Sequence, residues 1–120
     1  MPAEEPNKGQ RKEQRKNLFI YLRVVEGNTM EMIGRLADAS ESGLLLLTEK
    51  EMSVNEIYDM EIEYHLSETS TARIPIEGQV RWCKPDVNPS HFAVGFKITK
   101  IEPNMKIRLK QIISYLKFRN

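Results

Sequence analysis

The sequence predicts an all-β, antiparallel fold with one helix at its C-terminal end. Three observations carry this prediction: six short segments rich in β-branched and aromatic residues, turn-forming residues between them, and a single helical stripe after the last segment. With 120 residues, of which 40% are hydrophobic, the chain can bury a core as one globular domain. The number and spacing of the strands fit either a barrel or a sandwich.

A polar leader precedes the first predicted strand. Residues 1–16 contain no large apolar side chain after Met1. A segment of this composition cannot bury enough surface to offset the entropy that is lost when it is ordered. We therefore predict a flexible basic segment at residues 1–16, followed by a folded unit at residues 17–120.

Branched and aromatic residues define the first three predicted strands. The run "LFIYLRVVE" (18–26) is the first, and the turn "EGNT" leads from it into the second, "MEMIGRLA" (30–37). The polar stretch "DASESG" (38–43) is predicted to be a loop. The short apolar run "LLLLTE" (44–49) that follows is typical of a buried strand.

The fourth and fifth predicted strands show the clearest alternation. In "IYDMEIEYHL" (57–66), apolar and aromatic side chains alternate with polar ones, which is the period of a half-buried strand. The stretch "SETSTA" (67–72) is predicted to be a loop and "RIPIEGQVRW" (73–82) the fifth strand. Alternation places Trp82 on the same face as Val80, so we predict that Trp82 packs in the core, with stacking on a base as the alternative. The side chains predicted to share the inner faces are Tyr58, Met60, Ile62, Tyr64 and Leu66, then Ile74, Ile76, Val80 and Trp82.

The chain ends with a sixth strand and a helix. "KPDVNPS" (84–90) has the composition of a loop, and "HFAVGFKI" (91–98) has that of a strand. Apolar residues then recur with helical spacing, and Pro103 suits the start of a helix that spans about 103–118. We predict that this helix packs across the barrel or against a partner. The apolar stripe consists of Met105, Leu109, Ile112, Ile113 and Leu116.

Composition limits the kinds of partner. The formal net charge is +1, from 18 basic and 17 acidic residues, which argues against a general binder of polyanions. No apolar stretch approaches the roughly 20 residues that span a bilayer, so we predict no membrane span. The first residues, "MPAEEPNKGQ", contain no hydrophobic core of a signal peptide, so the expected location is the cytoplasm.

No catalytic group or metal site is predicted. The single cysteine, Cys83, excludes an internal disulfide and a cysteine-rich zinc site. Neither His65 nor His91 has the spacing of a metal ligand, and the chain contains no glycine-rich phosphate loop. We therefore predict a binding protein without a cofactor, and not an enzyme.

Two polar motifs are candidates for ligand binding. In "RKEQR", Arg11 and Arg15 carry guanidinium forks that can bind phosphate oxygens or a guanine edge, although a basic run at a terminus can also be solvated charge. In "DASESG", the carboxylate of Asp38 can accept two hydrogen bonds from a guanine edge, and the hydroxyl of Ser40 can bind a phosphate or a base. Gly43 permits a close backbone approach or a positive φ. The same residues are also turn formers.

The two motifs together are more specific than either alone. "RxxxR" before the first strand, followed by "DxSxxG" between later strands, resembles the signature of the PilZ domain family. The stretches "EGQVRW" and "FAVGFKI" look like the late strands of that family, so the resemblance runs from about residue 10 to about residue 116. The matching residues are Arg11 and Arg15 in the first motif, and Asp38, Ser40 and Gly43 in the second.

The resemblance implies a six-stranded antiparallel barrel, of Greek-key-like topology, that receives the bacterial second messenger cyclic di-GMP (c-di-GMP). In such domains the arginines of RxxxR engage guanine and phosphate groups, which assigns that role to Arg11 and Arg15. The second motif contacts a guanine from the barrel surface. The resemblance therefore implies that Asp38 binds the Watson–Crick edge of the guanine, that Ser40 adds a further hydrogen bond, and that Gly43 maintains the conformation of the loop.

Two more residues are candidate ligand contacts. Family members differ at the residue just before RxxxR, which bears on how many ligand molecules bind, and here that residue is Gln10. Trp82 is the other, through stacking on a base. Ordering of the leader around c-di-GMP is expected to create a surface that an unidentified protein effector reads.

Two other functions stay open on the sequence. One is a PilZ-like protein-interaction domain that does not bind nucleotide; the presence of both motifs counts against it. The other is a small barrel that binds RNA or DNA through its leader. Aromatic residues do not interleave with the leader's charges, and the charge balance is nearly neutral, so we predict no nucleic acid polymer as a partner.

Overall fold

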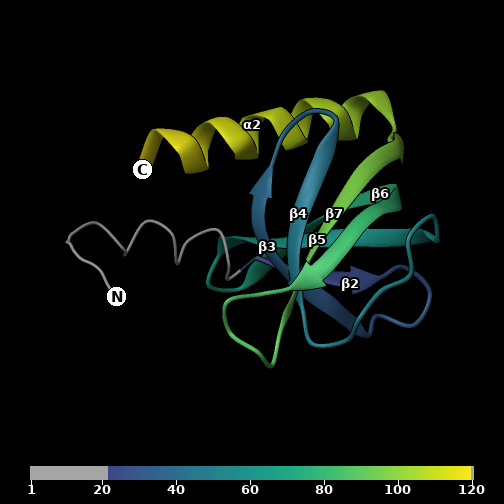
Figure 1. Ribbon diagram of the computed structural model, residues 1–120. Coiled ribbons are helices and arrows are strands. Elements are labelled where there is room, and N and C mark those ends of the chain that lie inside the picture. The colour runs from purple at the N-terminus through teal and green to yellow at the C-terminus, as the bar shows by residue number, and fades with distance from the viewer. Residues whose placement is uncertain (1–21, 120) are drawn as a thin grey trace.

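The computed structural model describes residues 22–119, with the backbone alone at Leu66 and residues 115–119. Within these residues, six antiparallel strands form a closed barrel in the order β2-β3-β4-β7-β6-β5, and one helix lies across one end of it (Figure 1). The predicted six-stranded barrel with a C-terminal helix is confirmed. The elements are β2 (Arg23–Glu26), β3 (Met32–Ala39), β4 (Gly43–Thr48), β5 (Ile57–Ser67), β6 (Ser70–Pro85), β7 (Phe92–Lys100) and α2 (Pro103–Arg119).

Pairing between β2 and β5 makes the fold a barrel and not a sandwich. Val24 on β2 is opposite Ile62 on β5, and on its other side β2 pairs with β3, where Val24 is opposite Gly34. Within residues 22–119, the closed circuit leaves no strand edge that could pair with another chain. The predicted first strand, 18–26, is described only from Leu22, and the predicted boundary at residue 17 lies outside the described residues.

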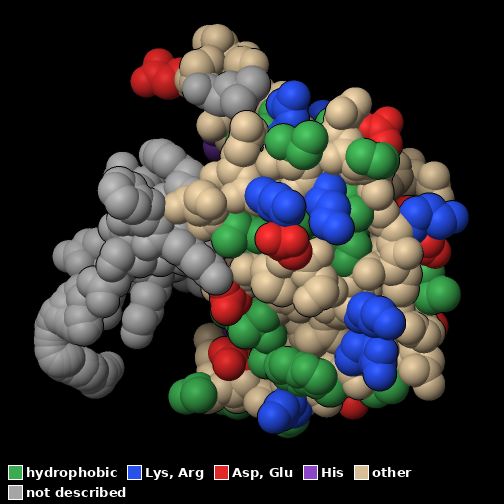
Figure 2. Space-filling view, turned by 90° about the horizontal axis from the view of Figure 1, so that it is seen from above, with side chains coloured by type: hydrophobic (Ala, Val, Ile, Leu, Met, Phe, Trp, Pro, Cys, Tyr) green, Lys and Arg blue, Asp and Glu red, His purple; other side chains and the backbone are tan. Residues whose placement is uncertain are grey.

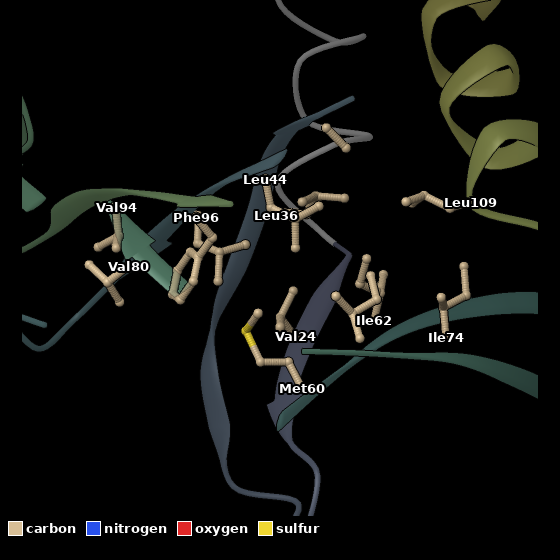
Figure 3. Close-up of a cluster of buried hydrophobic side chains, with 13 residues drawn as sticks. Val24, Leu36, Leu44, Met60, Ile62, Ile74, Val80, Val94, Phe96 and Leu109 are labelled. Atoms are coloured by element: carbon tan, nitrogen blue, oxygen red, sulfur yellow. The ribbon is translucent and has the colours of Figure 1, made fainter. Parts of the chain in front are cut away.

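The barrel interior is filled by the apolar half of each alternating strand. Val24, Leu36, Ile62, Ile74 and Val80 are completely buried. Of these, Ile62, Ile74 and Val80 are predicted by the alternation in the sequence. Figure 3 shows these side chains converging from different strands toward one centre. Tyr58, Tyr64, Met105, Ile112 and Ile113 are partly buried and pack against this cluster.

The helix packs on its own barrel. Leu109 is completely buried and reaches from α2 toward the cluster that contains Ile62 and Ile74 (Figure 3). Two polar contacts hold the helix from its sides: Arg108 donates a hydrogen bond of 3.2 Å to the Tyr64 hydroxyl, and the Lys110 ammonium lies 3.7 Å from the Glu41 carboxylate. Of the two predicted positions for the helix, the structure shows packing across the barrel. No helix within residues 22–119 combines the length and apolar character that crossing a membrane requires.

Several predicted element boundaries are wrong, because pairing continues into polar sequence. Asp38, which the sequence predicts to be in a loop, lies in β3, opposite Leu45. The predicted loop 67–72 shrinks to a tight turn, since Ser67 and Ser70 already pair with each other. The predicted loop 84–90 begins two residues later, after Pro85. A strand continues through polar residues wherever the backbone of a neighbouring strand can form hydrogen bonds with them.

Candidate nucleotide-binding groove

A groove of about 460 Å³ lies on the outer surface of β3, β4, β7 and β6. Its floor follows one row of paired residues across the four strands: Asp38 is opposite Leu45, Leu45 is opposite Gly95, and Gly95 is opposite Trp82. Asp38 and Trp82 therefore face each other across two intervening strands. The groove is also lined by Ala39, Ser40, Ser42, Gly43, Leu44, Arg81, Phe96 and Lys97.

A β-bulge in β6 brings Trp82 to this groove. Val80 pairs with Phe96 and Trp82 pairs with Gly95, so Arg81 is an extra residue opposite no single partner. A bulge shifts the alternation of side chains by one position. Val80 consequently points into the core, while both Arg81 and Trp82 are exposed and line the groove.

The predicted core packing of Trp82 is therefore wrong. Its side chain is 40% exposed, and the indole lies against Gly95 on β7. Sequence alternation also failed to single out Arg81, since strict alternation assigns opposite faces to neighbouring residues. The stretch "VRWCKP" (80–85) contains no glycine that would mark the bulge in the sequence.

Asp38 is held at the end of β3, where its carboxylate is exposed. A second irregularity in pairing lies between Leu36 and Asp38, next to the groove. Oδ1 of Asp38 accepts a hydrogen bond of 2.8 Å from the backbone N–H of Ala39. This bond ties one carboxylate oxygen to the backbone, and because the residue is exposed and a carboxylate has about four acceptor positions, further acceptor capacity is left for a ligand.

Ser40 and Gly43 together form the turn between β3 and β4. The backbone N–H of Ser40 donates to the carbonyl of Gly43 at 2.9 Å, and the Ser40 hydroxyl accepts from the backbone N–H of Gly43 at 3.2 Å. A β-carbon on Gly43 would come within 2.8 Å of the carbonyl oxygen of Phe96. Of the two reasons for a glycine that the sequence allowed, close backbone approach is therefore the one that applies.

Basic side chains border the groove. Arg81 and Lys97 line it, and the Lys84 ammonium lies over the Trp82 ring, 5.1 Å from its centroid. No ion pair between residues of the described part of the chain involves Arg81, Lys84 or Lys97. On the helix side of the molecule, by contrast, basic and acidic side chains are interspersed (Figure 2). The groove thus combines a local positive charge with one carboxylate, although the whole chain is nearly neutral.

The first described residue, Leu22, is bonded to β3. Its carbonyl accepts a hydrogen bond of 2.8 Å from the N–H of Leu36, which lies two residues before Asp38. Arg11, Arg15 and Gln10 lie outside the described residues. The seven residues from Leu22 back to Arg15 can span at most about 25 Å when extended.

A second hollow, of about 550 Å³, has the opposite electrostatic character. It lies between β5, β6 and the start of α2, and the carboxylates of Asp59, Glu61, Glu77 and Glu102 line it together with a single cation, Lys100. Lys100 is also 3.8 Å from Glu77. An anionic ligand would be repelled here, and of the predicted site residues that the structure describes, none lies in this hollow.

The fold is a small closed antiparallel β-barrel that carries a groove on its outer surface. The sequence profile of the PilZ domain matches residues 9–115, and the chain belongs to this family. The match includes the leader that carries Arg11 and Arg15 as well as the barrel. A comparison with curated proteins gave no significant match.

Two solved structures share the fold. The inhibitor of motility MotI (DgrA) from Bacillus subtilis superimposes with a TM-score of 0.68 at 18% identity, over 82% of this chain and 48% of that one. The chain thus spans about half the length of MotI. The PilZ domain of YcgR from Escherichia coli, in a structure with c-di-GMP, gives a TM-score of 0.57 at 14% identity, over 82% of this chain and 84% of that one. At such low identity these similarities show the fold alone.

Proposed function

We propose that this chain is a receptor for c-di-GMP and that the nucleotide binds in the groove between Asp38 and Trp82. The observation that carries the proposal is the convergence of Asp38, Ser40 and Gly43 with an exposed tryptophan and two cations in one groove. Membership of the PilZ family and the c-di-GMP in the YcgR structure support the choice of ligand.

Each part of the groove suits a part of the ligand. The carboxylate of Asp38 accepts hydrogen bonds from N1–H and N2–H of a guanine, and the Trp82 indole provides a surface on which a purine stacks. Arg81 and Lys97 attract the two phosphate groups. Ser40 already bonds within the turn, so its main contribution is to hold Asp38 and the backbone of the turn in place.

The leader supplies the remaining contacts. Arg11 and Arg15 clamp the phosphates and a guanine of c-di-GMP. Binding orders the leader over the barrel, and the surface created in this way is read by a protein effector. The entropy lost on ordering lowers the affinity for the nucleotide.

Calorimetry with c-di-GMP on the native chain and on Arg15→Ala tests the proposal. Removal of one arginine from a desolvated charge pair costs about 2–5 kcal/mol, so we expect affinity to fall about 30-fold or more. Lys16→Ala is the matched control, since it removes the same charge from the adjacent position and should change affinity much less. The absence of heat from the native chain would refute a c-di-GMP receptor and favour a PilZ-like interaction domain.

Amide hydrogen exchange tests the ordering of the leader separately. Exchange in residues 1–16 should slow when c-di-GMP is added, because the backbone then loses contact with water. Unchanged exchange with intact binding would remove leader ordering from the mechanism and leave the nucleotide site in place.

A further inference from the structure

Two residues outside both family motifs contact the Trp82 indole. One is Gly95, which lies opposite Trp82 on β7, and the other is Lys84, which follows Trp82 by two residues on β6. Neither residue belongs to RxxxR or DxSxxG. Both bear on where the indole lies.

Gly95 provides the space in which the indole lies. A β-carbon at this position would come within 2.3 Å of both Cε2 and Nε1 of Trp82, far inside van der Waals contact. The neighbours Val94 and Phe96 are buried in the core, so position 95 faces outward, toward the groove. Any side chain larger than that of glycine would push the indole off the groove floor.

Lys84 contacts the ring through its ammonium. The ammonium lies over the ring at 5.1 Å from the centroid, within the range of a cation–π interaction. Trp82 lines the groove and Lys84 does not. The lysine therefore supports the ring without occupying the space that a ligand would enter.

We propose that Gly95 and Lys84 are positioning residues that fix the Trp82 indole as one wall of the groove, ready for a purine to stack on it. An exposed tryptophan without such contacts samples several rotamers, and fixing it in advance removes part of the entropy lost on binding. The identity of the purine ligand rests on the function proposed above. The position of the ring does not depend on that function.

Trp82 is the only tryptophan of the chain, so its fluorescence tests the ring position in the free protein. In Lys84→Gln and Gly95→Ala, we expect lower emission anisotropy and stronger quenching by acrylamide, because the indole moves more freely. Lys84→Arg should restore the native values, since guanidinium retains the cation–π interaction. Lys50→Gln removes an exposed charge elsewhere and serves as the control. Native anisotropy and quenching in Lys84→Gln and Gly95→Ala would overturn the proposal.

Binding of c-di-GMP tests whether the two residues act through Trp82. Lys84→Gln should weaken binding about two- to fivefold, and Gly95→Ala by about 5- to 150-fold, the range for loss of one stacked base.

In a Trp82→Ala background, Lys84→Gln should have no further effect. An equal loss in that background would mean that Lys84 contacts the ligand directly, and tighter binding by Lys84→Gln would mean that it covers the stacking surface; either result contradicts the proposal. If the native chain does not bind c-di-GMP, the proposed function fails, while the fluorescence of the free protein still decides the position of the ring.

Discussion

The outer face formed by β2, β5 and β6 carries a ladder of ion pairs, whereas the outer face formed by β3, β4, β7 and β6 carries the groove. In the ladder, the Glu63 carboxylate lies 3.4 Å from Arg23 and 3.2 Å from Arg73, and Arg73 is also 3.7 Å from Glu61. In the groove, no such ion pair joins Asp38 to another residue within the described part of the chain.

The difference predicts that stability and ligand binding depend on different faces of the barrel. Charges in the ladder satisfy one another across neighbouring strands, so they stabilise the barrel slightly and offer little to a ligand. Charges in the groove border a hollow that contains an exposed aromatic ring, so their hydrogen-bonding capacity can be directed at a ligand. Substitutions on the two faces should therefore affect different measurements.

The largest expected effect is the loss of nucleotide binding in Asp38→Ala. Hydrogen bonds to a charged group contribute about 1.5–3 kcal/mol, so affinity for c-di-GMP should fall about 10- to 150-fold in calorimetry. Glu63→Gln, which removes the central carboxylate of the ladder, is the control and should bind like the native chain. Equal losses in both variants would contradict the separation of the two faces.

Gly43→Ala should lower the stability of the groove side of the barrel. The added β-carbon would come within 2.8 Å of the Phe96 carbonyl oxygen, a backbone atom that cannot move aside alone. Overpacking of this kind costs about 1–3 kcal/mol, measured as the free energy of unfolding in urea. Gly27→Ala is the control, because its nearest atom, the Asp59 carbonyl oxygen, lies at 3.4 Å. A larger loss in Gly27→Ala than in Gly43→Ala would refute the steric explanation.

A smaller effect is expected from a matched pair of arginine substitutions. Arg73→Gln breaks the ladder and should cost less than about 1 kcal/mol in the free energy of unfolding, with a smaller cost at high salt. It should leave binding unchanged. Arg81→Gln should have the opposite pattern: it should weaken c-di-GMP binding and leave the free energy of unfolding at the native value. A binding defect in Arg73→Gln would show that the ladder face takes part in recognition.

The smallest effect concerns Tyr58. Its side chain is partly buried against the core and packs edge to face against Phe96, with ring centroids 6.3 Å apart. Burial raises the pKa of Tyr58, and its hydrogen bond of 2.8 Å to the Glu56 carboxylate raises the pKa further. Because the pKa is higher in the folded than in the unfolded state, the neutral hydroxyl stabilises the fold below the unfolded value of about 10, and this contribution is lost as pH rises through the folded pKa.

Unfolding in urea between about pH 9 and pH 11 measures this contribution. Stability should decline with rising pH in the native chain and decline less steeply in Tyr58→Phe, which has no hydroxyl to ionise. An equal slope in the two proteins would show that Tyr58 does not titrate differently on folding.

Much of the fold could be predicted because it depends on local pattern. The alternation in "IYDMEIEYHL" corresponds to β5, in which Met60 and Ile62 are buried and Asp59 is exposed. The helix begins at Pro103 as predicted, since proline fits the first turn and the apolar stripe starts after it. Strand ends were harder to predict, because polar residues such as Thr71 join a strand whenever a neighbour pairs with them.

The candidate site divides in the same way. Asp38, Ser40 and Gly43 could be named from the sequence, because the residue types at that spacing resemble a family signature, and the structure places all three at one groove. Arg81 and Gly95 could not be named. Their relevance depends on which strand pairs with β6 and in which register, and a single sequence does not contain that information.

By itself, the sequence determined the β character of the strands, the helix at the end, and the identity of the motif residues. These follow from properties of single residues and their neighbours along the chain. Only the tertiary structure decided the position of Trp82. Alternation assumes one residue on each strand per pair, and the bulge after Val80 breaks that assumption, because β6 has to curve around the barrel against β7. One unpaired residue therefore moved the only tryptophan of the chain from the predicted core to the wall of the groove.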